Sequence, residues 1–208
     1  MDSDLRKSMS TVSLDPETLL SAYAQGAFPM ADRDGVIRWY TADPRGVIPL
    51  EHDQFHVPHT LRQLIRHRKF DVRINHAFEA TMRACKDVPR AQGDGTWISD
   101  ELVAAYVELH ELGFAHSVEC WLDDQLVGGL YGVSLGGAFF GESMFHTARD
   151  ASKVALVHLV ERLRERGFEL LDTQATTEHL KRFGCVDVPA DDYLKRLRHA
   201  LVKKCQFD

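Results

Sequence analysis

Paired cysteines and metal-binding motifs are missing from this chain of 208 residues. The four cysteines lie far apart and form no C-x-x-C pair, which argues against a zinc site and against a dense disulfide framework. None of the eleven histidines stands in an H-E-x-x-H or comparable ligand spacing. We therefore expect reduced, mostly buried thiols and no metal ion. The cysteines are Cys85, Cys120, Cys185 and Cys205.

Long apolar runs are missing as well. No stretch approaches the roughly 18 to 20 apolar residues that span a bilayer. The first residues, "MDSDLRKSMSTVS", lack the apolar centre of a secretory signal. We therefore expect a cytoplasmic protein.

Positive charge is in short supply, since the formal net charge is -6. This balance argues against a protein that coats nucleic acid nonspecifically, although local basic clusters can still contact phosphates. Two candidates are "RQLIRHRKF", residues 62–70, and "LKRLRHALVKK", residues 194–204. Apolar residues recur in both at helical spacing, so the alternative interpretation is the solvated face of an amphipathic helix.

What is present is an ordinary globular composition, with 44% hydrophobic and 27% charged residues. The pattern predicts a small mixed α/β unit over residues 1–94. Asp15, Pro16 and Gly26 mark the cap, first turn and end of a first helix. A loop-rich part rich in Pro, Gly and Asp turns follows, up to residue 50. Further helices are expected over residues 58–66 and 77–85, with a strand over 70–74 between them.

A more regular pattern begins at residue 95 and predicts a second unit over residues 95–208. Ser99 caps a helix, three strands follow with tight turns at Asp123-Asp124 and Gly136-Gly137, and a long helix comes next. A further strand and two helices complete the chain. The expected ranges are helix 99–112, strands 116–122, 126–135 and 138–144, helix 151–166, strand 168–174, and helices 177–184 and 191–202.

This order of elements is typical of the acetyltransferase-like (GNAT) fold, an α+β fold with a mixed, largely antiparallel sheet. Acetyltransferases of this fold hold the pyrophosphate of coenzyme A on a glycine-rich loop before the long helix. Here the corresponding stretch, "FHTARDASKVAL", has no glycine, and Asp150 places negative charge near the helix N-terminus. An acetyl-CoA-dependent N-acetyltransferase is therefore the weaker interpretation.

A resemblance to a known family covers nearly the whole chain. The chain resembles the leucyl/phenylalanyl-tRNA–protein transferases in ten segments, in order and spacing. It departs from them modestly, with Tyr40 where a second tryptophan is frequent and Ala42 where proline is common. The segments are "AYAQGAFPM", "RWYTADPRGVIPL", "GTWIS", "LHELGFAHSVECW", "LVGGLYGV", "FFGESMF", "ASKVAL", "LLDTQ", "HLKRFG" and "VPADDYL".

The resemblance implies a cytoplasmic aminoacyltransferase that uses no cofactor. Such an enzyme moves Leu or Phe from aminoacyl-tRNA to the N-terminal α-amine of proteins that start with Arg or Lys, which marks them for degradation by the N-end rule. A noncatalytic module that binds tRNA or degradation signals is a further alternative, because it would hold both partners without forming product.

The chemistry of the residues fits such a transfer, which needs an apolar slot for the amino acid. Leu130, Phe139 and Met144 can line that slot if they point to one side of adjacent strands. Simple core packing is the alternative for each of them. The neighbouring glycines of "LVGGLYG" and "FFGES" suit close backbone approach or mark bulges.

Three polar residues are the candidate catalytic groups. Glu142 is a lone acid in the apolar run "FFGESMF", where burial is costly unless a cation or a site opening meets it. It faces the acceptor's Arg or Lys, or it only orders backbone amides. Asp172 and Gln174 project from one face of a strand and can align the attacking amine. Alternatively, the pair caps the following "TTEHL" helix.

Aromatic and basic residues complete the expected site. Trp39, Tyr40 and Trp97 can stack on or wall the terminal adenosine, or they are core aromatics. The resemblance favours Arg66, Arg68 and Lys69 as contacts to the tRNA backbone.

Overall fold

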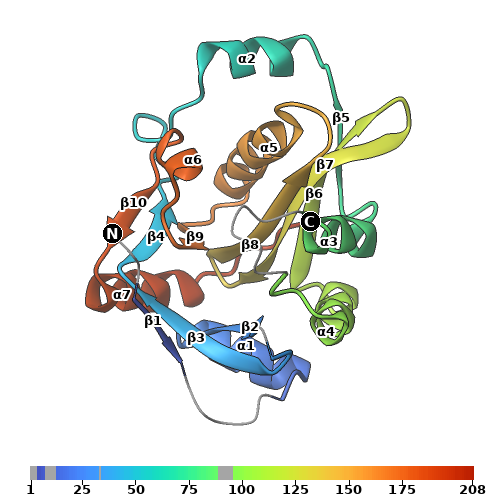
Figure 1. Ribbon diagram of the computed structural model, residues 1–208. Helices are drawn as coiled ribbons and strands as arrows, with labels where there is room; N and C mark the ends of the chain where they lie inside the picture. Colours follow the sequence, from blue (N-terminus) through green and yellow to red (C-terminus); the bar gives the residue numbers. More distant parts are fainter. Residues whose placement is uncertain (1–3, 8–12, 33, 89–95) are drawn as a thin grey trace.

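The computed structural model describes residues 4–7, 13–32, 34–88 and 96–208. Its main feature is a seven-stranded sheet (Figure 1). β8 and β9 run parallel, and the other neighbouring pairs are antiparallel, as expected for the acetyltransferase-like fold. In spatial order the strands are β10 (Val186–Val188), β4 (Arg45–Ile48), β9 (Leu170–Gln174), β8 (Ala138–His146), β7 (Gln125–Leu135), β6 (Ala115–Leu122) and β5 (Asp71–Ile74).

Helices cover both faces of this sheet because its strands alternate apolar side chains between two cores. Leu130 and Phe139 belong to one core, and their neighbours Tyr131 and Phe140 belong to the other. α5 (Ala151–Glu165), α2 (His59–Arg66) and α6 (Glu178–Lys181) supply buried residues to the first core. The second core receives α1 (Pro16–Ala24), α3 (Phe78–Lys86), α4 (Asp100–Glu111) and α7 (Ala190–Leu201).

The predicted central elements are confirmed. The three-stranded meander, the long helix after it and the parallel strand β9 follow in the expected order. The Ser99 side chain accepts from the Leu102 amide at 3.2 Å at the start of α4. Asp123 and Asp124 turn between β6 and β7 with φ values of 50° and 56°, which Asp tolerates better than most residues.

The first helix also begins and ends as predicted. The Asp15 side chain accepts from the Thr18 amide at 2.9 Å, and Pro16 is the first residue of α1. Gly26 has φ of 80°, a left-handed conformation that glycine adopts at no steric cost. This turn brings the chain back toward the sheet.

The expected loop-rich part contains three strands, so that expectation is wrong. β2 (Phe28–Ala31) and β3 (Ile37–Asp43) form a small sheet with β1 (Asp4–Lys7), in the order β1-β3-β2. The turn between β2 and β3 closes through Asp32, whose amide donates to Val36 at 3.0 Å. β4 then enters the large sheet between β9 and β10.

The expected boundary between residues 94 and 95 lies outside the described residues. β4 and β5, which precede it, are strands of the large sheet. The division into units 1–94 and 95–208 stays a prediction. Among the described residues, no helix is long and apolar enough to cross a membrane.

Candidate active site

A cavity of about 380 Å³ opens where β8 and β9 separate. The described part of the chain pairs the two strands from Ala138 with Leu170 to Phe140 with Asp172, and shows no further pair between them. Beyond that point the strand ends diverge, and residues of several elements line the gap. They are Phe28, Met30, Trp97, Leu130, Tyr131, Gly141, Glu142, Ser143, Met144, Leu156, Leu159, Leu171, Thr173, Gln174, Ala175, Thr177, His179 and Leu180.

Most of this lining is apolar, which suits a hydrophobic ligand group. Leu130 and Met144, two of the three residues predicted to line an aminoacyl slot, lie in this wall, and their role in binding stays a prediction. Leu156 and Leu159 of α5 add to the same wall and were missed, because their helical spacing is also that of ordinary core residues. The cavity can hold an unbranched, branched or aromatic side chain of modest size.

Phe139 lies outside the cavity lining. Its side chain is fully buried, and its ring stacks on Phe207 at a centroid distance of 5.2 Å. The Phe207 ring also stacks on His116 at 4.3 Å. The structure therefore places Phe139 in the core, the alternative that the apolar pattern left open.

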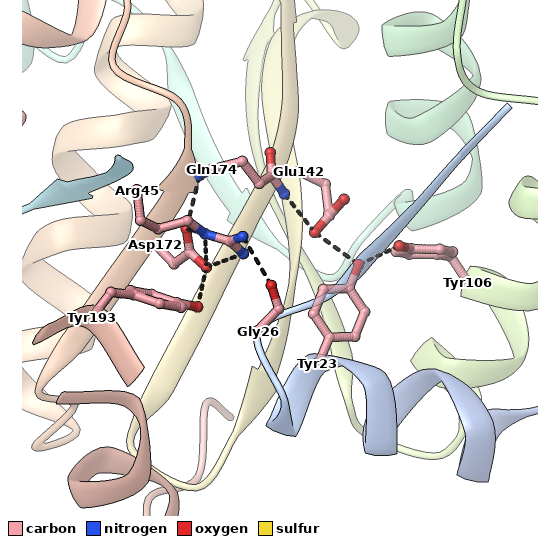
Figure 2. Close-up of polar contacts among 8 residues, drawn as sticks. All are labelled: Tyr23, Gly26, Arg45, Tyr106, Glu142, Asp172, Gln174 and Tyr193. Atoms are coloured by element: carbon pink, nitrogen blue, oxygen red, sulfur yellow. Dashed lines mark hydrogen bonds and ion pairs between the residues drawn. The ribbon is translucent and has the colours of Figure 1, made fainter. Parts of the chain in front are cut away.

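Glu142 lines the cavity within a chain of hydrogen bonds (Figure 2). Its Oε1 accepts from the Tyr23 hydroxyl at 2.8 Å and from the Gln174 side-chain amide at 3.0 Å. Tyr23 also bonds to the hydroxyl of Tyr106. The other oxygen, Oε2, is buried and has no hydrogen-bond partner among the described residues.

Burial raises the pKa of Glu142 from 4.5 to about 8, and the nearby negative charge of Asp172 adds to the rise. The hydrogen bonds from Tyr23 and Gln174 and the charge of Arg45 oppose it. At neutral pH the carboxyl group therefore carries a proton in the ligand-free protein. A cation that enters the cavity would favour the ionised form.

Asp172 is fully buried and is not among the cavity-lining residues. Arg45 binds it with two nitrogens, Nε to Oδ1 at 2.9 Å and Nη2 to Oδ2 at 2.7 Å. The Tyr193 hydroxyl donates to Oδ2 at 2.6 Å, and Arg45 Nη1 donates to the Gly26 carbonyl at 2.9 Å. Pairing offsets part of the cost of burying the two charges. The contacts join β4, β9 and α7 (Figure 2).

Asp172 also holds the backbone of Gln174. The Gln174 amide donates to Asp172 Oδ1 at 2.8 Å, and Gln174 has φ of 59°, a costly conformation for a residue with a side chain. Its side-chain nitrogen donates to Glu142, so the amide group has a fixed orientation at the cavity. The capping alternative does not hold, because Thr177 caps α6 by accepting from the Leu180 amide at 3.2 Å.

Of the three candidate aromatic residues, Trp97 lines the cavity. Tyr40 is buried on β3 and its hydroxyl bonds to Asp32. Trp39 is the next residue back on that strand and packs against the second core. The structure therefore brings one of the three to the cavity.

The basic residues Arg66, Arg68 and Lys69 are exposed at the end of α2 and in the turn after it. They are not among the residues that line the cavity. A role for them requires a ligand much larger than an amino acid.

Sequence reasoning missed the partners of the polar residues. Tyr23, Arg45 and Tyr193 stand 119, 127 and 21 residues from the groups they contact. No local pattern reports such pairing. Tyr23, Arg45 and Tyr193 stand in "AYAQGAFPM", "RWYTADPRGVIPL" and "VPADDYL", three segments of the family resemblance, but no pattern assigned them a role in the site.

The family models and the curated relatives that match this chain carry the same family description. A family model described as leucyl/phenylalanyl-tRNA protein transferase matches residues 47–198, and the model of its N-terminal domain matches residues 13–43. The curated leucyl/phenylalanyl-tRNA–protein transferase of Gloeobacter violaceus is 54% identical over 197 residues, covering 94% of this chain and 98% of that protein. That of Salinibacter ruber is 53% identical over 189 residues, covering 90% and 80%. Among solved structures, an aminoglycoside acetyltransferase from a soil metagenomic sample is 15% identical, with a TM-score of 0.40, over 65% of this chain and 88% of that one.

Proposed function

The chain belongs to the leucyl/phenylalanyl-tRNA–protein transferase family, whose members are aminoacyltransferases, and we propose that its acceptors are proteins with N-terminal Arg or Lys. The donor side chain, Leu or Phe, occupies the apolar wall formed by Leu130, Met144 and Leu156. The acceptor amine and the ester carbonyl meet at Glu142 and Gln174.

The observation that carries this proposal is the fixed amide of Gln174 at the edge of an apolar cavity. Its nitrogen donates to Glu142, and its backbone is held by Asp172. The amide oxygen can then accept a hydrogen bond from the attacking amine. Asp172 is a positioning residue in this scheme, because it acts through Gln174.

The reaction forms the peptide bond between the amine nitrogen and the ester carbonyl carbon, and breaks the ester bond to the adenosine oxygen. The amine loses a proton, and the departing oxygen gains one to become a hydroxyl. An α-amino group has a pKa near 8, so its deprotonation at pH 7 costs only about 1 kcal/mol. Orientation of amine against ester can supply roughly 7 to 11 kcal/mol, so positioning dominates over base strength.

Recognition of a cationic acceptor follows from Glu142. Oε2 of Glu142 is buried and has no hydrogen-bond partner within the described ranges of the chain. An Arg or Lys side chain that reaches this oxygen would ionise the carboxyl group and pair with it. Because the ester is already an activated donor, the chemistry needs no coenzyme A. We place the reaction in the cytoplasm, where aminoacyl-tRNA is made.

The test is to incubate the protein with leucyl-tRNA and matched peptides that begin with Arg, Lys or Ala, and to determine the product masses. Addition of one leucine to the Arg and Lys peptides is expected, with little product from the Ala peptide. Equal use of all three would contradict the acceptor assignment. Binding of both partners without product would identify a noncatalytic module, and product from acetyl-CoA would identify an acetyltransferase.

A further inference from the structure

Cationic side chains gather beside the cavity where α5 begins. Lys153 lies in the first turn of α5, and Arg149 precedes the helix. Arg182 is the exposed C-cap residue of α6. Residues of both helices line the cavity, Leu156 and Leu159 from α5 and His179 from α6. The cations therefore stand at one edge of the site.

Asp150 lies close to the first two cations and pairs with Lys153 at the shorter distance. Its carboxylate lies 2.6 Å from Lys153 Nζ and 3.6 Å from Arg149 Nε. The pKa of Asp150 is lowered mainly by the hydrogen bond from Lys153, with further contributions from the charges of Arg149 and Lys69. Lys69 therefore lies near the same helix end, although it comes from the turn after α2.

His179 connects this cluster to the cavity. Its Nε2 is buried and has no hydrogen-bond partner in the described part of the chain. Burial lowers its pKa, and the positive charges of Lys153 and Arg182 lower it further. The imidazole is thus neutral at pH 7 and lies within electrostatic range of both cations.

The local charge is opposite in sign to that of the whole chain. Lys69, Arg149 and Lys153 act on the carboxylate of Asp150, and Lys153 and Arg182 act on the imidazole of His179. The neighbouring Glu178 is already paired with Lys181 at 2.7 Å. Lys153 and Arg149 offset the negative charge of Asp150, which from the sequence alone argued against a phosphate at this helix end. On a chain with a formal net charge of -6, the remaining excess of positive charge indicates a site for an anionic ligand.

We propose that Lys153 and Arg182 bind the phosphodiester on the 5′ side of the terminal adenosine of aminoacyl-tRNA. This inference rests on the proposed function. If the ester carbonyl lies at Gln174, the adenosine lies at the cavity, and its 5′ phosphate can be only a few bonds farther out. The strand then leaves across Arg149 toward Lys69, which joins the site to the exposed basic segment after α2.

The experiment compares phenylalanyl-adenosine with the same compound carrying a 5′ phosphate, both as donors to an Arg-started peptide. The wild type is expected to use the phosphorylated donor about fivefold to tenfold better in kcat/KM, the range for two partly exposed ion pairs. In the double variant Lys153→Met/Arg182→Met the preference should fall to about one, with the unphosphorylated donor used as before. Lys181→Met, which removes a neighbouring paired lysine, should keep the preference.

Binding of full-length aminoacyl-tRNA over a salt series is the second readout. Two lost contacts to a single strand should reduce the logarithmic salt slope by about 1.4 in the double variant. A wild type without preference for the phosphorylated donor, or a preference that survives in the double variant, would overturn the inference. Failure of both donors in the wild type would instead count against the proposed function.

Discussion

At the scale of single residues, Glu142 lies in the site and also makes the stability of the fold depend on pH. Its folded-state pKa of about 8 lies above its ordinary value of 4.5 because the carboxyl group is buried. Between about pH 4.5 and pH 8, the carboxyl group therefore keeps its proton in the folded protein and loses it on unfolding. Stability from this group is therefore complete below about pH 4.5 and disappears as the pH rises through about 8.

We predict that the free energy of unfolding falls more in the wild type than in Glu142→Gln as the pH rises from 6 to 8. The expected difference is about 2 kcal/mol, since one proton corresponds to about 1.4 kcal/mol per pH unit. Urea unfolding at several pH values measures it. Other titrating groups are common to both proteins and cancel in the difference. Parallel curves would mean that Glu142 is ionised in the folded protein over the whole range.

The same substitution tests recognition of the acceptor. Glu142→Gln should reduce kcat/KM for an Arg-started peptide. The decrease should correspond to about 1.5 to 3 kcal/mol of lost transition-state stabilisation, the range for a charged hydrogen bond. A peptide that starts with uncharged norleucine should show a much smaller change, because it brings no cation. Glu161→Gln, an exposed position on α5, serves as the control. An equal loss for both peptides would assign Glu142 to structure alone.

At the scale of elements, the close approach of β4 to the end of β9 determines where Gln174 lies. A Cβ on Gly46 would come within 2.5 Å of the backbone carbon of Ala175 and 2.8 Å of the Thr176 nitrogen. Such contacts are too short to persist, so one of the two segments must move. No other residue type fits here without displacing the strand end that holds Gln174.

Gly46→Ala is therefore expected to lower kcat strongly while costing roughly 1 to 3 kcal/mol of stability. Gly35→Ala is the matched control. It introduces a Cβ at φ of 78° with no atom of the described residues within 4 Å, and should cost roughly 1 to 2 kcal/mol without touching the site. Steady-state kinetics and unfolding of both variants give the comparison. Similar kcat values in the two would show that Gly46 does not position Gln174.

The elements also show what a sequence can and cannot reveal. Alternation and turn residues predict β6, β7 and β8, because those strands pair with their neighbours along the chain. β4 has four residues, and its partners β9 and β10 lie more than a hundred residues away, so nothing local identifies it. The same limit applies to the residues in and around the cavity. Glu142, Gln174, Leu130 and Met144 were predicted from motifs, whereas Arg45 and Tyr193 became apparent only when distant elements met.

At the scale of the whole molecule, we predict that the basic residues at the end of α2 and in the turn after it act on tRNA and not on the chemistry. Charge reversal of Arg66, Arg68 and Lys69 should strongly reduce use of full-length aminoacyl-tRNA and spare aminoacyl-adenosine. Each lost phosphate contact should lower the logarithmic salt slope by roughly 0.7 to 0.9. Kinetics of both donors over a salt series provide the measurement. The same loss on both donors, or an unchanged slope, would make the segment a solvated helix face.

The pairing of Arg45 with Asp172 has a consequence for how the protein folds during its synthesis. The two residues are 127 positions apart, so the ribosome must add that many residues after Arg45 before its partner exists. Until then the guanidinium stays in water, and β4 has neither β9 nor β10 beside it. Contacts of such long range form late because chain closure must come first. A nascent chain can thus form the β5–β8 meander early. The site is complete only when the last quarter of the chain, with β9 and β10, has folded against the first quarter, with β4.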